Sequence, residues 1–206
     1  GWNEAPGYWN YAMQYLDVGL STLNVAFGSD YCLSKSMGME ETLKFAIATL
    51  GVTGPNNFHD MGLGSNSSYS EFSYLSSLYG NKTAYEMRLN EIYSKSTATV
   101  NDLLYYRTDG YGDDTNEAEN VNYIKGVELF SVRDSFNKEE GKFFFSTHYG
   151  TTSGYHQHND CSSFVLDIDG IRWAEDLGSE DYNLQNELGY PEYSLYRKRA
   201  EGHNVM

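Results

Sequence analysis

The segment 164–173 has the sequence FVLDIDGIRW, in which Asp169-Gly170 separates two short runs rich in β-branched and aromatic residues. An Asp-Gly pair suits the two positive-φ positions of a tight two-residue turn, and the flanking runs have the composition of strands. The segment therefore predicts a β-hairpin, and with it an antiparallel sheet in this part of the chain.

The residues before this hairpin have the same character. Short runs rich in Val, Ile, Phe and Tyr with a two-residue period occupy 127–132 and 142–149, and glycines separate them from their neighbours. We expect residues 121–206 to form part of an antiparallel β-sandwich.

The first half of the chain has a helical period instead. Apolar residues between Tyr8 and Phe27 recur every three or four positions, which predicts a helix that buries one face. That face consists of Tyr8, Tyr11, Ala12, Tyr15, Leu16, Leu20, Leu23 and Phe27. Similar patterns predict helices over 39–50, 70–79, 83–93 and 100–106, so residues 1–108 form a helical unit.

Residues 109–120 contain five acidic residues and two glycines, a composition typical of a solvated linker. The predicted class is therefore α+β, with a helical unit and a sheet unit joined by this acidic linker.

Composition excludes several functions. The 206 residues are 40% hydrophobic and include 32 aromatic side chains, so the chain folds. A formal net charge of -15 argues against nucleic acid as a partner. No stretch is long and apolar enough for membrane insertion. Cys32 and Cys161 leave the redox compartment open. Because the chain starts at Gly1 without Met, we expect it to be a piece of a longer protein, from which a leader would be missing.

A His-x-His pair stands at His156 and His158, with Asp176 after the hairpin and His203 near the end. Alternate residues of a strand share a face, so the two imidazoles could face one site, and two imidazoles with a carboxylate form a common zinc site. The alternative is a solvated strand face. His59 and His148 have no such company and are taken as structural or surface residues.

Two further features have both a functional and a structural interpretation. An aromatic cluster at 1–11, which includes Tyr8, Trp9 and Tyr11, could be a sugar platform or simply core packing. The only basic run, Arg197-Lys198-Arg199, could be a solvated face or a site that attracts an anionic ligand.

At these residues the chain resembles the heparinase II/III family of polysaccharide lyases. The matching pieces are EAPGYWNY at 4–11, GVE at 126–128 with Arg133, HQHND at 156–160, SFVL at 163–166, GIRWAEDLG at 170–178 and YRKRAEGHN at 196–204. They occur in the family's order and run nearly from end to end.

The resemblance implies a fold and a chemistry. It implies that the chain contains the last helices of an (α/α) toroid and the start of an antiparallel β-sandwich. It also implies β-elimination on uronic-acid-containing polysaccharides, in which a base removes the C5 proton and an acid protonates the departing O4. A further Asn or His that neutralises the uronate carboxylate is expected on an earlier toroid helix.

The resemblance also implies roles for individual residues. Tyr8 would be the catalytic phenol, with Tyr11 as the alternative, and His156 the catalytic histidine. His158, Asp176 and His203 would hold a structural zinc ion, while Trp9, Arg197 and Arg199 would bind substrate.

The implied partner is an acidic polysaccharide, and the implied location is periplasmic or secreted. Two other functions stay open: a non-catalytic, zinc-containing carbohydrate-binding or surface protein on the same scaffold, and zinc-dependent hydrolysis.

Overall fold

A computed structural model describes residues 3–62, 69–107, 118–137, 139–150, 156–186, 188–189 and 191–206. Most of the expected acidic linker, residues 109–117, lies outside this range. The chain divides into two compact units. The first, called the sheet unit below, consists of Gly1–Trp9, Ala48–Asn66 and Asn120–Met206, and the second, called the helical unit below, of Asn10–Ile47 and Ser67–Glu119.

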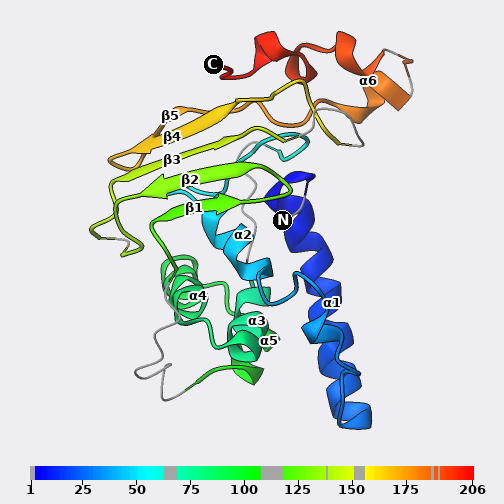
Figure 1. Cartoon of the computed structure of the whole chain (residues 1–206), viewed down its shortest axis with the longest axis vertical. Helices are drawn as coiled ribbons and strands as arrows, with labels where there is room; N and C mark the ends of the chain where they lie inside the picture. Colours follow the sequence, from blue (N-terminus) through cyan, green and yellow to red (C-terminus); the bar gives the residue numbers. More distant parts are fainter. Residues whose placement is uncertain are drawn as a thin grey trace. The chain divides into compact units, whose positions relative to one another are not determined.

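In the part of the chain that the structure describes, five α-helices precede the strands, as the sequence predicts (Figure 1). They are α1 (Ala5–Phe27), α2 (Thr42–Thr49), α3 (Glu71–Tyr79), α4 (Lys82–Lys95) and α5 (Val100–Leu104). In the described residues, no helix is both long enough and apolar enough to cross a bilayer.

Local chemistry sets the helix boundaries. Gly80 has a φ of 65° and ends α3, while the neighbouring Asn81 begins α4 by accepting a hydrogen bond from the Ala84 amide at 2.9 Å. At the start of α5, Asp102 accepts a bond from the Thr99 amide and also pairs with the buried Arg88 at 2.7 Å. One carboxylate thereby links α4 to α5.

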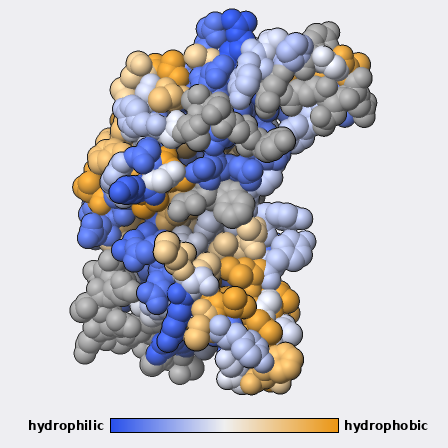
Figure 2. Space-filling model, turned by 45° about the vertical axis from the view of Figure 1, so that its right-hand side comes forward, coloured by the Kyte–Doolittle hydropathy of each residue, from blue (hydrophilic) through white to orange (hydrophobic). Residues whose placement is uncertain are grey.

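The predicted buried face of α1 is confirmed at Leu20 but wrong at Tyr11, Tyr15 and Phe27, which are exposed. The helix buries Trp9, Met13 and Leu20, whereas Tyr11 and Tyr15 are 61% and 67% exposed. The buried stripe also contains the polar Asp17, so a search for the most apolar stripe selects the other face. Hydrophobic residues gather on the surface around α1, in the lower part of the view in Figure 2.

The strands form one antiparallel sheet in chain order, which confirms the α+β class (Figure 1). They are β1 (Val121–Ile124), β2 (Leu129–Arg133), β3 (Phe143–His148), β4 (Phe164–Ile168) and β5 (Ile171–Ala174). The hairpin is confirmed: Ile168 pairs with Ile171, and Asp169 and Gly170 both have positive φ. The sequence did not predict β1, a four-residue edge strand.

The sheet holds the segment Ala48–Asn66 in place through buried polar contacts. Asp167 accepts hydrogen bonds from the Thr53 amide and hydroxyl, both at 3.0 Å, and from Arg172 at 2.8 Å. Farther along the segment, Asn56 donates to the Ser146 hydroxyl at 2.8 Å. These contacts fix the backbone that leads into His59 and Asp60.

The chain beyond the sheet forms only short helical elements in the described residues. They are α6 (Tyr182–Asn186) and the 3₁₀ turns η2 (Glu192–Ser194), η3 (Tyr196–Lys198) and η4 (Ala200–Gly202). One further 3₁₀ turn, η1 (Leu33–Lys35), lies between α1 and α2. The turns bring Lys198 and His203 back to the sheet unit, where the candidate site lies.

Candidate functional site

Two tyrosines, a histidine and an aspartate meet in the sheet unit. The Tyr8 hydroxyl lies 3.3 Å from His156 Nδ1 and 3.0 Å from the Tyr182 hydroxyl. Asp60 Oδ2 lies 2.9 Å from both His156 Nδ1 and the Tyr182 hydroxyl. Tyr8 comes from the first turns of α1, Tyr182 begins α6, and Asp60 belongs to the segment that the sheet holds.

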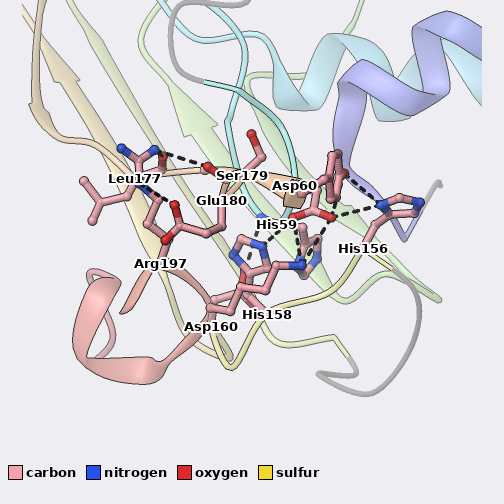
Figure 3. A network of polar contacts seen from close by, with 12 residues as sticks. His59, Asp60, His156, His158, Asp160, Leu177, Ser179, Glu180 and Arg197 are labelled. Carbon is pink, nitrogen blue, oxygen red and sulfur yellow. Dashed lines mark hydrogen bonds and ion pairs between the residues drawn. The ribbon is translucent and has the colours of Figure 1, made fainter. Parts of the chain in front are cut away.

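Asp60 joins this group to a second histidine. Its Oδ1 lies 2.9 Å from His158 Nε2 and 3.2 Å from the ammonium of Lys198. Figure 3 shows the Asp60 carboxylate between the imidazoles of His156 and His158. Burial alone would raise the pKa of Asp60, but the hydrogen bonds from His158 and His156 and the charge of Lys198 lower it below its usual range. Asp60 is therefore an anion.

The anion determines where the protons lie. An ionised carboxylate accepts hydrogen bonds, so it favours the His156 tautomer with its proton on Nδ1 and leaves Nε2 able to accept a proton. The Tyr182 hydroxyl donates to Asp60. Burial and the contacts with Tyr8 and Asp60 raise the pKa of Tyr182, so it stays protonated. Since its proton goes to Asp60, its oxygen is free to accept one from Tyr8.

The backbone is strained at two of these positions. His59 has a φ of 57° and His156 a φ of 62°, in the left-handed region that residues other than glycine seldom adopt. Such outliers cluster at functional sites, where the surrounding structure maintains them. Two of the nine non-glycine residues with positive φ in the described part of the chain thus lie in the segments that carry Asp60 and the His-x-His pair.

The structure brings together His158, Asp176 and His203, the three expected metal ligands. One ligand atom from each lies within 4.8 Å of the others. Asp176 is fixed by His203 Nδ1 at 2.6 Å, the Ser163 hydroxyl at 3.0 Å and the Gly178 amide at 2.8 Å. His158 Nδ1 and His203 Nε2 are buried and have no hydrogen-bond partner in the described residues.

The other expected site residues have different surroundings. Trp9 is 2% exposed, so its ring packs within the protein. Tyr11 belongs to the helical unit, where its ring lies edge-on to Tyr15 at 5.3 Å. Arg197 donates to the carbonyls of Leu177 and Ser179 (Figure 3). Arg199 pairs with Glu201 at 2.6 Å near the surface.

Sequence analysis missed Asp60, Tyr182 and Lys198. Asp60 follows a histidine directly, and that His-Asp pair was the one available signal. Lys198 is 1% exposed although it stands in a basic run that has a solvated face as one interpretation. Its burial beside Asp60 depends on a contact 138 residues away in sequence.

Comparison with known proteins supports the fold. No protein-family model matches the sequence, and no curated protein matches it either. Among solved structures, it is similar to heparan sulfate lyase HepC from Pedobacter heparinus (TM-score 0.59) and to the heparinase III BT4657 gene product (TM-score 0.68). Identity is 14% in both cases, and the match covers 98% of this chain but 28% of each of those chains. The chain thus shares the fold of part of these proteins.

Proposed function

We propose that the protein is a polysaccharide lyase of the heparinase II/III family that cleaves uronic-acid-containing glycans by β-elimination. The observation that carries the proposal is the meeting of Tyr8, His156 and the buried anion Asp60 at hydrogen-bond distances. The likeness in fold to a heparan sulfate lyase supports it.

β-Elimination requires a base for the C5 proton and an acid for the leaving oxygen. As the C5–H bond breaks, its electrons form the C4=C5 double bond, and the C4–O4 bond breaks. His156 is the base in this proposal, because Asp60 favours the tautomer with a free Nε2. Its imidazole is 34% exposed and therefore open to substrate. Tyr8 donates its phenolic proton to O4.

A structural zinc ion is part of the proposal. His158, Asp176 and His203 offer two imidazoles and a carboxylate, a donor set that suits zinc. The unpartnered nitrogens of both histidines fit this role. Bound zinc would join the His158 segment to the chain end at His203. Because Asp60 contacts His158 as well as His156, a fixed His158 also helps to orient the catalytic histidine.

The proposed substrate is an acidic polysaccharide, and the proposed location is periplasmic or secreted. The net charge of -15 opposes polyanion binding at a distance, so substrate recognition depends on local cations. Arg199 is a candidate because it lies near the surface, whereas Arg197 is engaged with backbone carbonyls.

The test is to incubate the protein at its full natural length with heparan sulfate, chondroitin, hyaluronan and alginate. Ultraviolet absorbance of the C4=C5 bond should appear with at least one substrate and disappear in His156→Ala. New reducing ends without that absorbance would establish hydrolysis instead. Binding without any product would establish a carbohydrate-binding protein.

A further inference from the structure

A second group of metal-ligand side chains lies beside the network in Figure 3, where His59 and Asp160 are labelled. His59 Nδ1 lies 3.0 Å from Asp160 Oδ2, and His148 Nε2 lies 3.2 Å from the same oxygen. One ligand atom from each of the three residues lies within 4.8 Å of the others. None of them belongs to the group formed by His158, Asp176 and His203.

All three side chains are buried with unsatisfied polar atoms. His59, His148 and Asp160 are 7%, 3% and 0% exposed. His59 Nδ1, His148 Nε2 and Asp160 Oδ1 have no hydrogen-bond partner in the part of the chain that the structure describes. A buried polar atom without a partner costs on the order of 1–3 kcal/mol, so three such atoms on side chains that meet at Asp160 need a cause.

The separations are compatible with metal ligands. Both N–O distances would also suit a hydrogen bond, but neither nitrogen has a hydrogen-bond partner in the described residues. Ligand atoms bound at about 2.0–2.2 Å to one tetrahedral ion lie roughly 3.3 Å apart, and each points at the ion rather than at its neighbour. The observed 3.0 and 3.2 Å agree with that arrangement.

We propose that His59, His148 and Asp160 bind a second divalent transition-metal ion, with zinc as the metal best suited to two imidazoles and a carboxylate. The ion would cross-link three segments: the one before Asp60, the end of β3, and the turn after His158. It would stabilise the positive-φ backbone at His59 and hold Asp60 in position. The inference does not depend on the proposed lyase activity.

The first test counts metal ions on the wild-type chain. Protein freed of metal by a chelator is titrated with cobalt(II), whose tetrahedral sites give visible absorption, and then with zinc measured by mass spectrometry. We expect two equivalents of either metal per chain and a rise in melting temperature with each. Saturation at one equivalent that His148→Gln does not remove would overturn the proposal.

Matched variants assign the sites. His148→Gln should lose one equivalent of zinc, His203→Gln should lose the other, and the double variant should bind none. Circular dichroism checks that each variant is folded. If a variant does not fold, the number of metal equivalents bound by the wild-type chain decides the question. If the wild-type chain binds one equivalent of metal, and this equivalent is lost in His148→Gln but kept in His203→Gln, the result would support the new site and contradict metal binding by His158, Asp176 and His203. Two equivalents retained in a folded His148→Gln would refute the new site.

Discussion

At the scale of single residues, Asp60 has the most consequential position. Its two carboxylate oxygens contact different histidines, the expected base His156 and the expected metal ligand His158. The side chain is 1% exposed, and Lys198 is the buried cation beside it. A buried charge is tolerated only when it is paired, so the site depends on all of these contacts together.

We predict that Asp60→Asn lowers kcat by about 10²- to 10⁴-fold, with a much smaller change in KM. The amide keeps the shape of the side chain but can donate to His156 Nδ1, which favours the tautomer whose Nε2 carries the proton and cannot act as a base. The measurement is the initial rate of unsaturated-product formation against substrate concentration. Zinc content serves as the control, and an unchanged kcat with normal zinc would contradict this role.

Tyr8→Phe should abolish elimination while polysaccharide binding stays nearly intact. The change removes one oxygen and keeps the ring, so it separates proton transfer from packing. General acid–base catalysis contributes about 10²- to 10⁴-fold, and the loss should reach the upper end. Tyr11→Phe is the matched control, and it should retain its rate. A fast Tyr8→Phe beside an inactive Tyr11→Phe would transfer the role to Tyr11.

Sequence alone supports part of the site. The motifs at 156–160, 170–178 and 196–204 named the residues that the structure brings within 4.8 Å of one another in the first metal group. They gave no indication of Asp60 or that Asp160 would meet His59 and His148, because these contacts join residues up to 138 positions apart. His59 and His148 were taken as structural or surface residues since neither has a ligand neighbour in sequence.

At the scale of elements, hydrophobic period and turn chemistry predicted five of the six α-helices and four of the five strands in the described residues. The Asp169-Gly170 turn succeeded because its signal is local. The buried face of α1 failed because burial depends on what lies opposite, and the helix buries Asp17 while leaving Tyr11 and Tyr15 exposed. Strand β1 was missed because four residues beside an acidic segment give too short a pattern.

Two glycines provide a matched test of this reasoning. Gly170 has a φ of 75°, and Gly19 is an exposed position inside α1; a Cβ would meet nothing within 4 Å at either one. A new methyl group therefore has the same room at both positions, and the two positions differ only in backbone conformation. We predict that Gly170→Ala destabilises by roughly 1 kcal/mol and Gly19→Ala stabilises by roughly 0.5–1 kcal/mol in urea unfolding. Equal signs for the two changes would contradict the turn assignment.

At the scale of the whole molecule, the two compact units are interleaved along the chain. Residues 48–66 belong to the sheet unit although helical segments flank them, and they supply Asn56, His59 and Asp60. Their amino-acid pattern is that of a loop, so only tertiary contacts such as the bond from Asn56 to Ser146 assign them to the sheet. The candidate site consequently combines a loop from the first half with strands and turns from the second.

Among the buried acids of the helical unit, Asp17 and Asp102 have opposite pH dependence. Burial raises the pKa of Asp17 to about 8, and neither of its carboxylate oxygens has a hydrogen-bond partner in the described residues. Burial would also raise the pKa of Asp102, but bonds from Arg88, Ser73 and Thr99 lower it to about 2. Asp102 therefore contributes stability above about pH 4 and loses it as the pH falls toward 2. Asp17 contributes fully below about pH 4 and loses its contribution as the pH rises toward 8.

We therefore predict that the helical unit is most stable near pH 4–5 and weakens toward pH 8, where the net charge of -15 adds self-repulsion. Asp17→Asn should remove part of this decline, with a gain of roughly 1–4 kcal/mol at pH 8 and little change at pH 4. The remainder is expected from Glu71, because burial also raises the pKa of that carboxyl. Urea unfolding followed by far-ultraviolet circular dichroism between pH 4 and 8 measures it. Asp102→Asn is the opposite control, because it breaks the Arg88 pair and should destabilise most at pH 8. A wild-type stability that rises steadily from pH 4 to 8, unaltered in slope by Asp17→Asn, would show that Asp17 is ionised in the folded protein.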